Sequence, residues 1–406
     1  KHFSSIVILR FVLAFVYIFI TMSAGVLLGY NIEQLGLLAL LGLNQFLITF
    51  ILYLRSNISG LHLFKTDSLI SVLDRVFMIA ICGVLLWTNI AGGKFKIEWF
   101  VYAQTVSYII TTFIALLIVF RKAQFKGFVW NYPFFVMIIK KSLPYAILIL
   151  LMTFYNRLDS VMLERMLGGG EGAEQAGIYA SAYRLLDATN MIAYLFSVIL
   201  LPMFSRMIKY KDSVEKLVKL SFTLLFIMSI TISSISFFYA KDIMGLLYKQ
   251  HIESSASVFR YLMTGFIAIS TTYIFGTLLT ANGSLKQLNI IAAFGMLINL
   301  GFNLLLIPIY KATGATYSSL ITQFITAIMQ VIVVQYLFRF KINYKYLLRL
   351  FVFIMGLIAF SYLSKGFPLA WYYNIFLLVV FSLLYCILLK LISLKSVLLL
   401  FKKEQI

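Results

Sequence analysis

The segment SLPYAILILLMTFYNRLDSVMLERML, residues 142–167, places polar side chains in the middle of an apolar stretch. Such a stretch is long enough to cross a hydrocarbon core of about 30 Å as a helix. Asn156, Arg157 and Asp159 lie near its centre. Because Arg157 and Asp159 are two residues apart, about 200° around a helix, they cannot pair with each other. Each must find a partner or water elsewhere, so the segment predicts a membrane helix with polar sites on two sides.

The whole chain has the composition of a membrane protein. Of its 406 residues, 62% are hydrophobic and 12% are charged, whereas a soluble domain is about 25% charged. Long apolar stretches predict an all-α, polytopic membrane protein with about twelve transmembrane helices and no soluble domain. The approximate limits of the expected spans are 4–30, 35–54, 68–88, 99–120, 142–165, 176–205, 217–240, 257–281, 285–308, 312–338, 347–364 and 370–394.

The net charge of +20 follows the expected topology. Most lysines and arginines fall on the face that carries both ends of the chain, so the positive-inside rule predicts that both ends are cytoplasmic. We therefore attribute the excess charge to topology and anionic lipid rather than to nucleic acid. The stretch 121–141 has basic ends and interleaved aromatic residues, which favours an amphipathic helix lying at the interface.

Arginines inside the expected spans indicate a solvated, positively charged cavity. A guanidinium keeps its charge, so at membrane depth it needs a cavity, a counter-charge or water. Such a cavity suits an anionic cargo, and phosphate is the obvious anion. Arg184 and Asp187 are i,i+3 and can form either a helix-stapling salt bridge or part of the cargo site. Arg75, beside Asp74, can alternatively snorkel to the interface. The candidate cavity cations are Arg157, Arg184, Arg75 and Arg10.

A second polar group occurs in the ninth and tenth expected spans. Asn299 and Asn303 are i,i+4 and project from one helix face. The following helix begins with small residues, Ser319 among them, which permit close helix packing. These groups can simply hydrogen-bond between helices, or they can join Asp159 in binding a monovalent cation, with proton transfer on Asp159 as the other possibility.

Catalytic and metal chemistry are not indicated. The three histidines and two cysteines are scattered and lack metal-ligand spacing. The segment LGGGEGAEQAG, residues 167–177, lacks the Lys-Ser/Thr ending of a phosphate loop, so we expect a flexible loop on the outer face. Its glutamates leave open a polymerase or glycosyltransferase with a positioned acid, although nothing pairs with them.

The pattern P-x(11)-N-R-x-D-x-x-M-L, followed by GIYASAYRL and LLPMFS, covers 144–205. A second pattern, N-L-x-x-N-L-x-L-I-P with GATYSSL, covers 299–320. In order and spacing these resemble the Wzx-type oligosaccharide flippases of the multidrug/oligosaccharidyl-lipid/polysaccharide exporter superfamily. The resemblance implies fourteen helices in two lobes plus a terminal pair, so we expect that two helices are missing upstream of Lys1.

On this resemblance the chain comprises a partial N-terminal lobe (1–120, family helices three to six), an inter-lobe linker (121–141), a C-terminal lobe (142–338) and two terminal helices (339–406). It implies a flippase, not an enzyme, that moves an undecaprenyl-diphosphate-linked oligosaccharide across the bacterial cytoplasmic membrane by alternating access. The product would be O-antigen (lipopolysaccharide), capsule or exopolysaccharide. Implied partners are membrane lipids and polysaccharide polymerase machinery, without nucleic acid.

The same resemblance assigns the four candidate arginines to a central cavity. It also assigns Asp159, Asn299, Asn303 and Ser319 to ion coupling. A coupling proton or sodium ion is implied, and no other cofactor or metal. Two alternatives stay open: a multidrug or organic-cation antiporter of the same superfamily, and an integral-membrane polymerase or glycosyltransferase. Organic cations would prefer acidic cavity groups to arginines, and a polymerase would need a larger outer loop.

Overall fold

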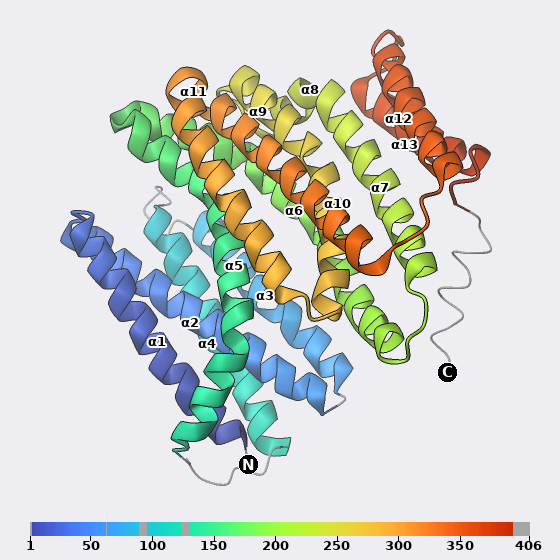
Figure 1. Ribbon diagram of the computed structural model, residues 1–406. Helices are drawn as coiled ribbons and strands as arrows, with labels where there is room; N and C mark the ends of the chain where they lie inside the picture. Colours follow the sequence, from blue (N-terminus) through green and yellow to red (C-terminus); the bar gives the residue numbers. More distant parts are fainter. Residues whose placement is uncertain (1, 62, 89–95, 123–129, 393–406) are drawn as a thin grey trace. The chain divides into compact units, whose positions relative to one another are not determined.

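The computed structural model describes residues 2–61, 63–88, 96–122 and 130–392. Regular structure in these residues is entirely helical and forms helices α1 to α13 (Figure 1). In this part of the chain, 11 helical segments are long and apolar enough to cross a membrane. The expected all-α, polytopic class is therefore confirmed, and the chain is a multi-pass membrane protein.

The chain divides into two compact units, Lys1–Lys141 and Ser142–Ile406. In the first unit, α2 packs against α1 and α4, and α4 also packs against α3. Leu54, Ile58 and Ala115 are fully buried in its core. The helices of this unit are α1 (His2–Leu27), α2 (Ile32–Gly60), α3 (Phe64–Trp87) and α4 (Ile97–Lys122).

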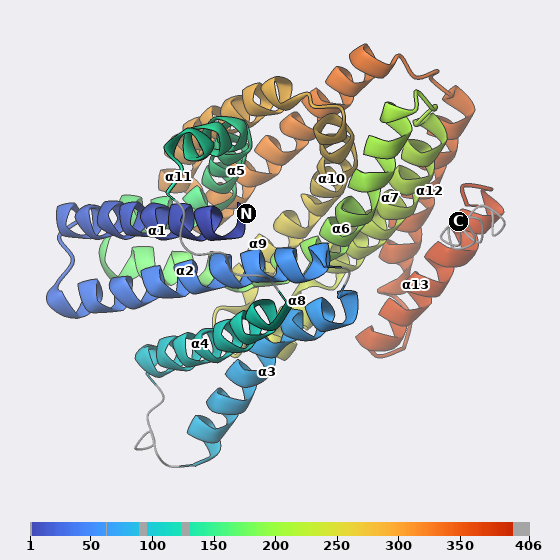
Figure 2. The same ribbon diagram turned by 90° about the horizontal axis from the view of Figure 1, so that it is seen from below.

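In the second unit, α10 packs against α6, α7 and α11, and the terminal helices α12 and α13 pack on α7 (Figure 2). Hydroxyl pairs join α7 to these terminal helices, at 2.6 Å between Thr231 and Ser382. The helices are the part of α5 (Tyr132–Leu167) from Ser142 onward, α6 (Gly169–Lys209), α7 (Glu215–Phe238), α8 (Ala240–Leu247), α9 (Ile252–Thr264), α10 (Phe266–Ala281), α11 (Leu285–Phe338), α12 (Tyr344–Ser364) and α13 (Trp371–Leu388).

Helix α11 is a helical hairpin. As one straight helix its 54 residues would extend roughly 80 Å, far more than the hydrocarbon core of about 30 Å. The backbone reverses at Lys311, where φ is 54° and ψ is −131°. The Ser318 hydroxyl donates to the Asn299 carbonyl over 2.9 Å, so the two halves lie side by side. The halves correspond to the expected spans 285–308 and 312–338. Because this hairpin is one of the 11 helical segments, the described residues contain one segment fewer than the roughly twelve spans expected.

The close approach of these halves depends on Gly314. A Cβ atom at Gly314 would lie 2.2 Å from the Leu306 carbonyl oxygen, too close for any backbone to accept without shifting. We expect Gly314→Ala to destabilise the fold by about 1–3 kcal/mol, the cost of overpacking a filled site. Thermal unfolding of the detergent-solubilised protein measures this effect.

Gly301 provides the matched control, because a Cβ there meets nothing within 4 Å. Gly301→Ala should leave stability unchanged or raise it by up to about 1 kcal/mol, since alanine favours helix. Equal unfolding temperatures for the two variants would contradict the proposed packing at the hairpin.

The glycine-rich segment 167–177 is helical except at Gly168, so the expectation that it is a flexible loop is wrong. Helix α5 ends at Leu167 and α6 begins at Gly169. Gly168 and Gly169 make the turn with φ of 67° and 53°, a conformation that glycine adopts without cost. Gly172 brings α6 against α5, since a Cβ there would lie 2.5 Å from the Glu164 carbonyl oxygen. The glycines therefore serve a tight helix–helix turn.

The linker expected at 121–141 overlaps two long helices. Helix α4 continues to Lys122, and α5 begins at Tyr132 and continues without a break to Leu167. Residues 132–141 are thus the first turns of a long helix rather than a separate interfacial one. Residues 123–129 lie outside the described part of the chain.

Candidate functional site

Asp159 is the centre of a buried polar cluster in the second unit. The Tyr179 hydroxyl donates to its Oδ2 atom over 2.6 Å. Its Oδ1 atom accepts from the Asn299 amide at 3.0 Å and from the Asn303 amide at 2.7 Å. Asp159, Asn299 and Asn303 are all 0% exposed. Helices α5, α6 and α11 thus meet at one carboxylate.

The hydrogen bonds to Asp159 all come from neutral groups. Among the described residues no lysine, arginine or histidine forms a salt bridge with it. A fully buried carboxylate is costly when ionised unless a cation or a proton neutralises it. The Oδ1 atom of Asn303 is also buried without a hydrogen-bond partner. An orphan oxygen beside an uncompensated carboxylate fits a small cation, and a proton on Asp159 would remove the same cost.

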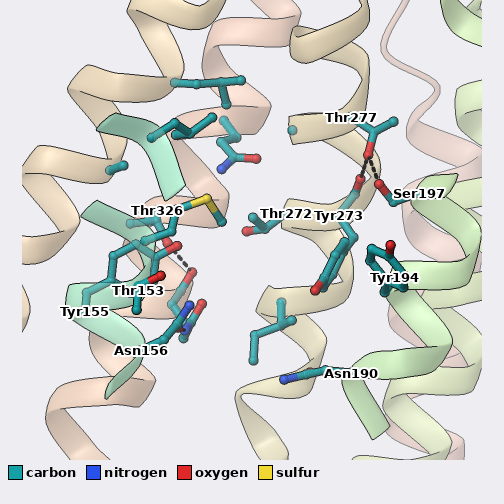
Figure 3. A pocket seen from close by; sticks show the side chains of 18 of the residues that line it. Thr153, Tyr155, Asn156, Asn190, Tyr194, Ser197, Thr272, Tyr273, Thr277 and Thr326 are labelled. Carbon is teal, nitrogen blue, oxygen red and sulfur yellow. Dashed lines mark hydrogen bonds between the residues drawn. The ribbon is translucent and has the colours of Figure 1, made fainter. Parts of the chain in front are cut away.

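A cavity of about 700 Å³ opens beside this cluster, between α5, α6, α10 and α11. Its lining is rich in tyrosine, threonine, asparagine and glutamine. Figure 3 shows Tyr155 and Asn156 on one side and Tyr194 and Tyr273 on the other, with side chains directed into the space. The Gln323 amide donates to Asn156 over 2.8 Å. Hydroxyl, amide and aromatic groups together suit a polar, hydroxyl-rich ligand, and the volume is typical of ligand pockets, at about 300–1,000 Å³.

Arg157 faces this cavity and pairs with Asp187. Its Nη2 atom donates to Asp187 Oδ2 over 2.9 Å, and its guanidinium lies 4.9 Å from the Tyr183 ring centroid. The Tyr183 ring stacks on Tyr179, at 5.6 Å between centroids. Because Tyr179 donates to Asp159, a continuous set of contacts joins the cavity arginine to the buried cluster. As the spacing predicts, Arg157 and Asp159 have different partners.

Asp187 pairs with Arg157 on α5, so the helix-stapling salt bridge with Arg184, one of the two alternatives for that pair, is not the arrangement in the structure. Arg184 lies on the next face of α6 and lines a second pocket of about 510 Å³ with Glu174, Lys249 and His251. Tyr179, Tyr183 and Asp187 share one helix face at i, i+4 and i+8, whereas Arg184 is turned about 100° from it. Asp187 consequently reaches the cavity and Arg184 does not line it.

The two remaining candidate arginines lie in the first unit. Arg10 donates to the Thr49 carbonyl over 3.1 Å and lies 4.6 Å from the Tyr53 ring centroid. Arg75 lies 3.5 Å from Asp74 and its side chain is 57% exposed. Each of these contacts lies within that unit.

Sequence reasoning missed Tyr179, Tyr183 and Gln323 as members of the site. The first two are spaced i,i+4 with Asp187, and that spacing is the signal that could have revealed them. Ser319, which was predicted, is 4% exposed and within hydrogen-bonding reach of the Tyr179 hydroxyl. The described residues contain no group of three His, Cys, Asp or Glu side chains that could hold a metal ion.

The fold is similar to those of several solved membrane proteins. The structure of "Lipid II flippase MurJ, inward closed conformation" superimposes with a TM-score of 0.75 and 12% identity, covering 95% of this chain and 82% of that one. An inward-facing MATE family multidrug transporter of the MOP superfamily gives 0.63 and 17%, covering 82% and 79%. A MOP superfamily transporter from Pyrococcus furiosus gives 0.60 and 16%, covering 82% and 77%. The three similar structures are thus a lipid flippase and two transporters.

Sequence comparison gives the family. Residues 1–208 match the family described as "Polysaccharide biosynthesis protein", and the chain belongs to this family. No curated protein matches the sequence.

Proposed function

We propose that this protein is a flippase that moves a polyprenyl-diphosphate-linked oligosaccharide across the bacterial cytoplasmic membrane. Transport proceeds by alternating access, from the inner to the outer leaflet, with both ends of the chain in the cytoplasm. The product is used in the assembly of a cell-surface polysaccharide such as O-antigen, capsule or exopolysaccharide. The family description and the lipid II flippase fold support this class of cargo.

The observation that carries the proposal is the combination of groups in the 700 Å³ cavity. Arg157 offers a planar guanidinium, which binds phosphate oxygens in a bidentate geometry. The amides and tyrosines around it can hydrogen-bond and stack with sugar rings. We propose that the diphosphate contacts Arg157, that the sugars contact the polar lining, and that the polyprenyl tail stays in lipid.

We propose that Asp159, Asn299, Asn303 and Ser319 provide the coupling-ion site. The buried carboxylate has neutral donors only, and the unpaired Asn303 oxygen supports a monovalent cation as its partner. A proton on Asp159 is the alternative co-substrate. Tyr179 contacts Asp159 and stacks on Tyr183, whose ring lies beside Arg157. Through these contacts, ion binding at Asp159 can influence the position of Arg157.

Proteoliposomes containing the full-length protein test the function directly. A labelled polyprenyl-diphosphate oligosaccharide is placed in one leaflet, and its appearance in the other is followed with an impermeant reagent. Parallel arms apply a sodium gradient, a proton gradient or no gradient. We expect protein-dependent translocation that one gradient accelerates, while protein-free liposomes show none.

The same vesicles are tested for uptake of organic cations. Cation uptake without lipid translocation, under any gradient, would contradict the flippase and favour the antiporter. Elongation of the glycan without translocation would instead favour a polymerase.

A further inference from the structure

The Arg157–Asp187 pair lies in an open cavity and not in a packed interior. The Arg157 side chain is 59% exposed and the Asp187 side chain 41% exposed. Ion pairs that solvent reaches stabilise a fold by only about 0–1 kcal/mol. The pair therefore contributes little to holding α5 against α6, and its position beside the ligand space calls for another explanation.

The pair with Asp187 also involves only a small part of the hydrogen-bonding capacity of Arg157. A guanidinium has five N–H donors, and within the described part of the chain Arg157 donates one hydrogen bond, to Asp187. The guanidinium also lies over the Tyr183 ring, 4.9 Å from its centroid. Phosphate groups can accept two parallel hydrogen bonds from a guanidinium, so a phosphate can displace the single contact to Asp187.

We propose that Asp187 is an internal competitor for the anion site at Arg157. When no cargo is bound, the Asp187 carboxylate pairs with Arg157. The cargo phosphate displaces this carboxylate on binding. Asp187 pairs with Arg157 again when the cargo leaves. This role rests on the proposed function and adds a specific residue that lowers cargo affinity and speeds cargo release.

Displaced Asp187 has other donors within the same cavity. Asn190 lies one turn further along α6 and Tyr273 lies across on α10, both directed into the cavity (Figure 3). Asp187 and Tyr273 line the same cavity. Because the Asp187 side chain is 41% exposed, the displaced carboxylate can keep hydrogen bonds to these neutral donors and to solvent, so the exchange at Arg157 is feasible within the existing lining.

Without the competitor, a phosphate at Arg157 would be bound tightly and released slowly. The test compares wild type with Asp187→Asn, which keeps the side-chain shape and removes the negative charge. The full-length protein in nanodiscs is titrated with a polyprenyl-diphosphate disaccharide, and proteoliposomes give the maximal translocation rate. We expect the dissociation constant to fall by about tenfold and the maximal rate to fall as well, because release becomes limiting.

Two control variants accompany this test. Asp187→Glu retains a competing carboxylate and should bind less tightly and transport faster than Asp187→Asn. Asp212→Asn removes the same charge from the exposed turn after α6 and should change neither. A merely structural role for Asp187 would weaken binding or leave it unchanged, and it would not produce tighter binding with slower transport.

The outcomes separate this inference from the proposed function. If wild type binds and translocates the lipid but Asp187→Asn binds it no more tightly, the competitor role is wrong and the flippase stands. If neither protein binds the lipid, the proposed function fails and the competitor role fails with it.

Discussion

Asp159→Ala is expected to destabilise the second unit by about 3 kcal/mol or more. The substitution removes the acceptor for three buried donors, on Tyr179, Asn299 and Asn303. Each donor left unpaired in a buried site costs about 1–3 kcal/mol, and the missing carboxyl group leaves a void. Native proteins are typically stable by only about 5–15 kcal/mol, so such a loss is large. Thermal unfolding and the yield of monodisperse protein measure it.

Asp212→Ala is the matched control, because Asp212 is exposed in the turn after α6 and should change stability by less than about 0.5 kcal/mol. If Asp159→Ala unfolds at the wild-type temperature, the three donors have other partners and the cluster does not hold α5, α6 and α11 together.

The conservative variant Asp159→Asn separates stability from ion coupling. Asparagine can still accept the hydrogen bond from Tyr179, so the protein should fold, although less stably than wild type. It cannot carry the negative charge that a cation or proton would neutralise. We expect translocation by this variant to lose its response to the sodium or proton gradient. A full gradient response in folded Asp159→Asn would remove Asp159 from the coupling site.

The buried cluster could be predicted from the sequence to a large extent. A carboxylate in mid-span and two asparagines at i,i+4 in another span are costly in a membrane unless they meet, and Asp159, Asn299 and Asn303 do meet. The hairpin also followed from length and from the residues after Pro308. Tyr179 escaped notice because a tyrosine in an apolar helix has many ordinary packing roles.

The partner of Arg157 could not be predicted, for a physical reason. Helical spacing identifies neighbours on one helix, and it offered Arg184 as the nearest partner for Asp187. Which face of α6 meets α5 depends on packing between helices, and that packing turns Asp187 toward Arg157. The glycine-rich turn was misread on similar grounds, since composition alone does not distinguish glycines that permit flexibility from Gly172, which permits close contact with α5.

Arg157→Ala is expected to reduce translocation of the diphosphate-linked cargo by about 10- to 100-fold. This range follows from the loss of a hydrogen bond to a charged group, which contributes about 1.5–3 kcal/mol. Two effects add. The phosphate loses its cationic partner, and Asp187 remains in the cavity as an unpaired negative charge that repels the phosphate. The protein should still fold, because the Arg157 side chain is 59% exposed. Proteoliposome translocation, together with unfolding temperature, measures both statements.

The repulsion from Asp187 gives this prediction a second, sharper part. Adding Asp187→Asn to Arg157→Ala removes the unpaired charge, so the double variant should translocate faster than Arg157→Ala alone while staying below wild type. Arg206→Ala, an exposed arginine in the last turn of α6, controls for the loss of one positive charge and should transport normally. Normal transport by a stably inserted Arg157→Ala protein would remove Arg157 from the cargo site. A double variant no faster than the single one would show that Asp187 does not act on the cargo's charge.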